Sequence, residues 1–327
     1  MKTVFGTLPS IVFAGLLATS ATFAVAQDKS GWPRSMAIGT GSQGGSYFVY
    51  GSGFASMISE ATGINATVEI TGGPVQNVTL VQTGDHDMGF VTTGPAYDAF
   101  IGKSELMPGV EHADIRALFP MYQTPLQAAV LSKSGIKSFK DMDSKRVGVG
   151  PAAGTSGTYW PRYFDQAGMD VTISNAGGSD TAGQLKDGMI DAFVYAAGIP
   201  TGAYSQLAVE NDVTFVSMAE EERDAFLQAE PAMAKFTIPA NTYEDQPEDV
   251  ETVALWNFAI AGKDMPDSLA YEIVRLAMEN PDRMKQIHAA AKETLPEHVD
   301  KNTFMTFHPG AVKWFEENGY KIPDNLK

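Results

Sequence analysis

The segment Ile38-Gly-Thr-Gly-Ser-Gln-Gly-Gly-Ser-Tyr47 joins a short apolar run to a stretch in which apolar side chains recur at helical spacing as far as Ile58. The same alternation continues further along the chain. Apolar, β-branched or helical patterns predict a strand over 67–70, a helix over 75–82 and a strand over 88–91. Strands that alternate with helices predict parallel βαβ units.

The same landmarks recur between 104 and 112 residues later, in the same order. Such a recurrence predicts two α/β lobes of similar build. The matched landmarks are Gly39 and Gly41 with Gly148 and Gly150, Ser46-Tyr-Phe48 with Thr158-Tyr-Trp160, Gly72-Gly73 with Gly177-Gly178, and Gly84, Asp87 and Gly94 with Gly188, Asp191 and Gly198.

Each landmark lies at the carboxyl end of a predicted strand, which is where parallel α/β sheets bind ligands. Two lobes that face each other with these ends would enclose a cleft and would need a hinge. We expect the chain to cross at Tyr122-Gln-Thr-Pro125, ahead of a strand over 126–131, and to return in a strand over 253–261. Lobe 1 is then residues 30–123 plus 255–327, and lobe 2 is residues 124–254.

Residues 1–26 have the layout of a secretory signal peptide. Lys2 precedes an apolar stretch without acidic residues, which ends in the cleavage pattern Ala24-Val-Ala26. The alternative is an uncleaved membrane anchor, but polar residues leave the apolar core short of the ~20 residues that a span needs. We therefore expect the mature chain outside the cytoplasm.

The composition limits the classes of partner. The chain has 327 residues, of which 44% are hydrophobic and 19% charged, as in a globular protein of about two domains. With 23 basic and 39 acidic residues the formal net charge is −16, which argues against binding to nucleic acid or to anionic lipid. The absence of cysteine excludes disulfides, thiol catalysis and thiolate metal sites.

Signals for a cofactor or for catalysis are weak. Gly39-x-Gly41-x-x-Gly44 matches the dinucleotide-binding pattern, but that pattern needs an acidic residue at the end of the next strand, and Glu69 lies inside that strand. The chain has no G-x-S-x-G motif and no histidine pair at metal-ligand spacing. We therefore predict no cofactor, no metal site, no catalytic residue and no enzymatic activity.

The glycine-rich loops suit a small anion, because glycine lets the backbone approach a ligand and exposed N–H groups at a helix start favour negative charge. The alternative is that the glycines only form tight turns and the hydroxyls only cap helices. Arg162 could pair with a carboxylate, although exposure to solvent or pairing with Asp165 would also account for it. The candidate ligand-binding residues are Ser42, Gly44, Gly45, Ser46, Tyr47, Thr71, Gly72, Thr92, Thr93, Tyr122, Thr155, Ser156, Gly157, Thr158, Arg162 and Gly198.

These motifs resemble the TAXI family, the extracytoplasmic solute receptors of TRAP transporters. The loop 154–158 is longer than the short Gly-Ser-Gly-Thr form common in that family, and Thr92-Thr-Gly94 differs from the polar and acidic residues often found there. The segments that carry the resemblance are Ile38 to Tyr47, Thr71-Gly-Gly-Pro-Val-Gln-Asn77, Gly84-Asp-His-Asp-Met-Gly89 with Ala96-Tyr97, Gly150 to Tyr159, Gly188-Met-Ile-Asp-Ala192, Gly198-Ile-Pro200 and Phe307-His-Pro-Gly-Ala311.

The resemblance implies an α/β type II periplasmic binding protein that delivers its solute to a TRAP membrane permease, driven by an ion gradient rather than by ATP. The family is associated with small organic acids, so we expect a carboxylate such as a dicarboxylate, a 2-oxo acid or an acidic amino acid. We expect a periplasmic monomer that captures the ligand by clamshell closure. Two alternatives stay open: a sensor that reports to a membrane signalling protein, and an extracytoplasmic enzyme that uses the same cleft.

Overall fold

The computed structural model describes residues 1–2 and 29–327. The predicted signal peptide, residues 1–26, therefore lies outside the described residues apart from its first two. Among the helices described, none combines the length and the apolar character needed to cross a membrane.

The amino-terminal βαβ series forms one half of the first lobe, with β1 in the middle of three parallel strands in the order β2-β1-β3. A strand or a helix is present at each place that the sequence predicted in this half. The elements are β1 (Ser35–Gly39), α1 (Ser46–Thr62), β2 (Asn65–Glu69), α2 (Pro74–Thr83), β3 (Met88–Thr92) and α3 (Thr93–Phe100).

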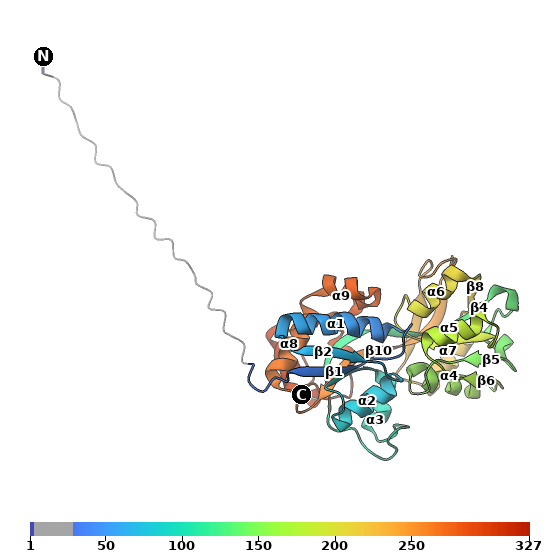
Figure 1. The fold of residues 1–327 in the computed structure, drawn as a ribbon, viewed down its shortest axis with the longest axis horizontal. Coiled ribbons are helices and arrows are strands. Elements are labelled where there is room, and N and C mark those ends of the chain that lie inside the picture. Colours follow the sequence, from blue (N-terminus) through green and yellow to red (C-terminus); the bar gives the residue numbers. More distant parts are fainter. Residues whose placement is uncertain (3–28) are drawn as a thin grey trace.

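The second lobe repeats this series, with parallel strands in the order β6-β5-β7. The predicted repeat is therefore present as two α/β units of the same topology (Figure 1). The elements are β5 (Arg146–Gly148), α4 (Thr155–Gln166), β6 (Thr172–Ser174), α5 (Gly178–Lys186), β7 (Ala192–Ala196) and α6 (Gly202–Glu210).

One of the matched landmarks was wrong by about one helical turn. α1 begins at Ser46 and α4 begins at Thr155, so the residue equivalent to Ser46 is Thr155 and not Thr158. The match relied on the aromatic residue that follows Ser46 and Thr158. Tyr47 is the second residue of α1, whereas Tyr159 is the fifth residue of α4, so the two tyrosines are not equivalent.

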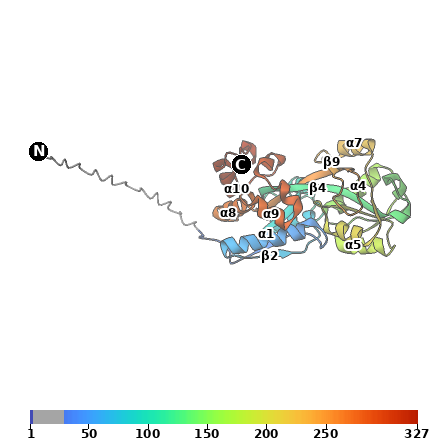
Figure 2. The same cartoon turned by 90° about the horizontal axis from the view of Figure 1, so that it is seen from above.

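Two long antiparallel strands, β4 (Ile115–Leu131) and β10 (Val250–Gly262), run through both lobes (Figures 1 and 2). β10 pairs with β3 in lobe 1, and β4 pairs with β7 in lobe 2. The predicted crossing at 122–125 was placed ahead of a strand, but it lies inside β4. Pro120 and Pro125 lack the N–H that a regular ladder needs, and the β4–β10 register shifts next to Trp256 and Ala259, so the strand bends rather than ends.

The remaining elements complete the two lobes. β8 pairs with β4, and β9 pairs with β10. His308 caps the last α-helix, because its side chain accepts a hydrogen bond from the Gly310 N–H. The bounds are β8 (Val213–Phe215), α7 (Glu220–Ala229), β9 (Ala234–Ile238), α8 (Asp267–Met278), α9 (Pro281–Ile287) and α10 (Pro309–Glu317), with short 3₁₀ helices at Ser132–Ser134, Phe139–Met142, Ala289–Glu293, Pro296–Lys301 and Asp324–Leu326.

The buried apolar residues form separate cores. One core draws on residues 36–122 and 258–326, and two others draw only on residues 126–255. We propose lobe boundaries at 30–123 plus 255–327 and at 124–254, and this division of the cores supports them. Because the lobes have separate cores and share β4 and β10, we expect motion between them to concentrate in these two strands.

Candidate ligand-binding site

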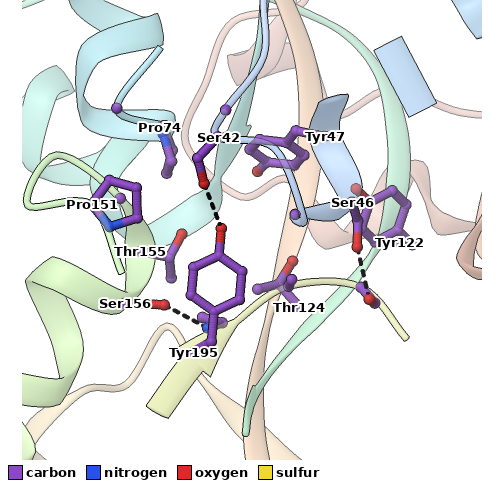
Figure 3. Close-up of a pocket in the computed structure, with 18 residues that line it drawn as sticks. Ser42, Ser46, Tyr47, Pro74, Tyr122, Thr124, Pro151, Thr155, Ser156 and Tyr195 are labelled. Carbon is purple, nitrogen blue, oxygen red and sulfur yellow. Dashed lines mark hydrogen bonds between the residues drawn. The ribbon is translucent and has the colours of Figure 1, made fainter. Parts of the chain in front are cut away.

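A cavity of about 40 Å³ lies between the lobes, at the carboxyl ends of the parallel strands (Figure 3). The segments that line it follow a strand or begin a helix, apart from Tyr122 and Thr124 in β4 and the last two residues of β7. Its walls are formed by Gly41, Ser42, Gly45, Ser46, Tyr47, Gly72, Gly73, Pro74, Tyr122, Thr124, Pro151, Gly154, Thr155, Ser156, Tyr195, Ala196, Ala197 and Gly198.

Three helices begin at this cavity, α1 and α2 of lobe 1 and α4 of lobe 2, and the starts of α1 and α4 share two features. Gly45 precedes α1 and Gly154 precedes α4, and neither can cap its helix with a side chain. No acidic residue stands in the first turn of either helix. The first N–H groups of a helix have no partner within the helix and carry its positive partial charge. The two helix starts therefore make the cavity favourable for an anion without a formal positive charge.

Hydroxyl groups connect the lobes around the cavity (Figure 3). The Ser42 hydroxyl lies 3.1 Å from that of Tyr195 in lobe 2, and it also accepts a hydrogen bond from the Gly178 N–H at 3.0 Å. Ser46 donates to the carbonyl oxygen of Gly198 at 2.7 Å. The first loop is thus bonded to the second lobe on both sides of the cavity, and the lobes are closed on each other.

Asn257, on β10, organises the aromatic wall. It is fully buried, accepts a hydrogen bond from the Tyr47 hydroxyl, and donates to the Tyr122 carbonyl and to Thr124 Oγ1. The three groups that it bonds belong to α1 and to β4, so one amide orients two elements. Sequence reasoning missed Asn257, because a single asparagine in an apolar strand has no local signature.

Tyr122 lines the cavity and carries a buried polar group. Its side chain is fully buried, and its hydroxyl makes no hydrogen bond to any described residue. Its ring stacks on the ring of His288, with centroids 6.1 Å apart. An unpartnered buried hydroxyl is costly, so a group bound in the cavity would stabilise it.

The tyrosine hydroxyls of the cavity remain protonated at neutral pH. Burial raises the pKa of Tyr47 and of Tyr122 well above the ordinary value. Burial also raises the pKa of Tyr195, although its hydrogen bond to Ser42 acts in the opposite direction. Tyr122 and Tyr195 can therefore donate a hydrogen bond to a solute, whereas the Tyr47 hydroxyl already donates to Asn257.

The structure brings nine of the sixteen predicted ligand-binding residues to the cavity wall. Their roles as ligand contacts stay a prediction. They are Ser42, Gly45, Ser46, Tyr47, Gly72, Tyr122, Thr155, Ser156 and Gly198.

Four of the other predicted residues lie behind the wall or in the contact between lobes. Gly44 has a positive φ of 85°, and a Cβ there would lie 2.7 Å from the backbone nitrogen of Ser179, so the glycine permits the lobes to touch. Thr71 donates to the Thr40 carbonyl at 3.1 Å, which turns it away from the cavity. Thr92 bonds Thr155 at 3.0 Å, and Thr93 is buried beside it at the start of α3.

The last three predicted residues lie along α4, after the two that line the cavity. Gly157 lies under the loop that contains Pro151 and Ala152, and Thr158 donates back to the Gly154 carbonyl at 3.2 Å. Arg162 is one turn further on and does not line the cavity. It forms ion pairs with Asp98 of lobe 1 at 3.1 Å and Glu230 of lobe 2 at 3.3 Å, and not with Asp165.

Several wall residues were not among the predicted set. Tyr195 is the most informative, since it comes directly before the strand tip Ala196-Ala-Gly198 that the repeat singled out. The sequence does contain a signal for Tyr195: an aromatic residue next to a strand tip, opposite a glycine-rich loop of the other lobe. The others are Gly41, Gly73, Pro74, Thr124, Pro151, Gly154, Ala196 and Ala197.

Within residues 29–327 no group of three or more His, Asp or Glu side chains is placed to hold a metal ion. No charged side chain from this part of the chain lines the cavity. What the arrangement offers chemically is a set of hydrogen-bond donors around a small enclosed space.

The two α/β lobes, the pair of crossing strands and the cavity between the strand tips define the architecture of the periplasmic solute-binding proteins. The chain belongs to the NMT1-like family, whose model matches residues 38–319.

Solved structures share this fold at low sequence identity. The chain is similar to MatC from Rhodopseudomonas palustris with bound malate, at 13% identity and a TM-score of 0.57 over 87% of this chain and 96% of that one. It is also similar to a protein described as a periplasmic transporter, at 13% identity and a TM-score of 0.55 over 82% and 96% of the two chains. An ancestral arginine-binding protein bound to arginine matches with 15% identity and a TM-score of 0.50 over 79% and 98%.

Proposed function

We propose that the protein is the periplasmic solute receptor of a TRAP transporter of the TAXI type, and that it captures a small organic acid between its lobes. Closure of the lobes buries the solute, and the closed protein delivers it to the membrane permease. The protein acts as a monomer and does not transform its ligand.

The observation that carries this proposal is the cavity at the facing starts of α1 and α4. Both N-caps are glycine, both first turns lack an acidic residue, and the surrounding side chains carry hydroxyls. This arrangement stabilises a carboxylate by partial charges and hydrogen bonds. In MatC the same fold holds malate, so the architecture is compatible with a small organic acid.

The TAXI assignment rests on the ordered motifs from Ile38 to Ala311, and the periplasmic location rests on the signal-peptide pattern of residues 1–26. Deletion of the gene should abolish uptake of the bound solute through the permease. A role in sensing predicts instead that uptake persists while a signalling response is lost.

A thermal-shift screen of organic acids, amino acids and neutral sugars tests the proposal, because a ligand that binds only the folded state raises its melting temperature. We expect organic acids to raise the melting temperature and sugars to leave it unchanged. A response to sugars alone would overturn the assignment of an anion site. Recovery of the bound acid unchanged after long incubation separates a receptor from an enzyme.

A further inference from the structure

The wall of the cavity is neutral, and this restricts the solute beyond the proposed receptor function, on which the inference rests. Among the described residues that line it there is no Lys, Arg, His, Asp or Glu. Arg162, the cation that follows the second loop, is held outside by Asp98 and Glu230. One carboxylate can be stabilised by the two helix starts, but a second negative charge would meet no cation.

The hydroxyls of the cavity are biased towards donation. Ser42, Thr124 and Ser156 each accept a hydrogen bond from an amide N–H, which leaves the hydroxyl hydrogen available. Ser42 and Tyr195 share one hydrogen bond, so one of their two hydrogens remains free for a solute. The amide donors are Gly178 N, Asn257 Nδ2 and Ala196 N, respectively.

Tyr122 supplies an independent sign of a ligand. Its hydroxyl is buried at the cavity wall and has no partner among the described residues. A protonated phenol in this position needs an acceptor, and a carboxylate or keto oxygen of the solute provides one. The hydroxyl hydrogens of Ser42 or Tyr195, Thr124, Ser156 and Tyr122 are therefore available to an acceptor on the solute.

The charge of the wall sets the class of the solute. We propose that the site binds a monocarboxylate through neutral donors alone, and that it discriminates against dicarboxylates and acidic amino acids. The wall offers no counter-charge for a second carboxylate.

Isothermal titration of the full chain tests this inference with propionate, lactate and pyruvate against succinate, 2-oxoglutarate and glutamate. We expect at least one of the three monocarboxylates to bind ten-fold or more tightly than any of the dicarboxylates. Propionamide, the neutral isostere of propionate, should bind at least ten-fold more weakly than propionate, because it lacks the negative charge.

The outcomes separate this inference from the proposed function. If a dicarboxylate binds most tightly, the limit on charge is wrong while the organic-acid receptor stands. If no carboxylate binds, or only a neutral sugar binds, both fail.

Tyr122→Phe provides the matching variant. Removal of the hydroxyl should weaken the best-bound monocarboxylate about ten-fold. Tyr50→Phe is the control, because Tyr50 belongs to the same aromatic cluster but its hydroxyl bonds Thr294 at 3.2 Å and does not line the cavity. Equal weakening in both variants would assign the effect to packing, and unchanged affinity in Tyr122→Phe would remove this hydroxyl from the site.

Discussion

Ser42 and Tyr195 share a hydrogen bond of 3.1 Å across the boundary between the two lobes, although 153 positions separate them in the sequence. Ser42 belongs to the loop after β1, and Tyr195 lies near the end of β7, the strand equivalent to β3. Both side chains line the cavity, so the contact that closes the lobes is also part of the wall that a solute would touch.

Replacement of both Ser42 and Ser46 by alanine should weaken ligand binding with little loss of stability. Both hydroxyls bond to lobe 2, so their loss costs the closed state about 1–2 kcal/mol, or roughly ten-fold in affinity. Titration calorimetry measures the affinity, and urea unfolding measures the stability.

The double variant Ser52→Ala with Ser56→Ala is the control, because both of these hydroxyls bond only carbonyls of α1 itself. It should bind the ligand normally. Unaltered affinity in the Ser42 and Ser46 variant would remove the first loop from the binding site.

Arg162 should act on closure rather than on ligand selectivity. Its pairing with Asp98 joins α4 of lobe 2 to α3 of lobe 1 at 3.1 Å, and both side chains are partly exposed. A pair of this kind contributes about 0.2–1 kcal/mol, so Arg162→Gln or Asp98→Asn should weaken every ligand by roughly two- to five-fold. A double-mutant cycle on the dissociation constant, repeated at high salt, measures the coupling.

Asp191→Asn gives the corresponding control, because Asp191 pairs with Arg146 inside lobe 2 at 2.7 Å. It should change stability slightly and affinity not at all. A change in the ranking of ligands on loss of Arg162 would show instead that the guanidinium contacts the solute.

Gly157→Ala should damage the second loop. A Cβ at this position would collide with the carbonyl oxygens of Pro151 and Ala152, which belong to the backbone and cannot move aside cheaply. We expect a loss of about 1–3 kcal/mol in the free energy of unfolding, together with weaker binding.

Gly183→Ala in α5 is the matched substitution, since a Cβ there meets nothing within 4 Å. It should be neutral or stabilising by up to about 1 kcal/mol, because alanine favours a helix more than glycine does. Thermal unfolding measures the stability of both variants. If Gly157→Ala is as stable as the parent protein, the predicted collision does not occur.

The stability of the protein should fall on acidification, in part because of His288. Burial lowers the pKa of His288 to about 4, below the ordinary value of 6.5 that it regains on unfolding. The unfolded state therefore binds the additional proton between pH 6.5 and 4. The stability contribution is complete above pH 6.5 and is lost by about 3 kcal/mol as the pH falls to 4.

His288→Asn should flatten this slope while retaining an acceptor for the Ala290 N–H that His288 Nδ1 now bonds at 3.1 Å. Part of the slope should remain, because burial also lowers the pKa of His308. Urea unfolding at pH 4.5, 5.5 and 7 measures the difference. Parallel curves for the variant and the parent would show that His288 does not titrate in this window.

The sequence predicted the architecture well because the relevant signals are local. Short apolar runs identify β1 and β3, the 3.6-residue spacing of apolar side chains identifies α1, and glycines mark the strand tips. The repeat then predicted two similar lobes. Each lobe has cores of its own, and the long strands β4 and β10 contribute residues to both lobes. The exception was the crossing at 122–125, which was placed ahead of a strand over 126–131 but lies inside β4, because the pairing with β10 continues through it.

By itself, the sequence determined the lobes, the loops and the region of the cavity, since backbone patterns depend on neighbouring residues. Only the tertiary structure decided which side chains face the cavity. Tyr195 and Asn257 belong to the site because they bond residues more than 150 positions away in the sequence. Arg162 is not part of the cavity wall, because it pairs with Asp98 instead. The physical reason is that a hydroxyl or a guanidinium bonds whichever partner the fold brings within about 3 Å, and no local pattern records that distance.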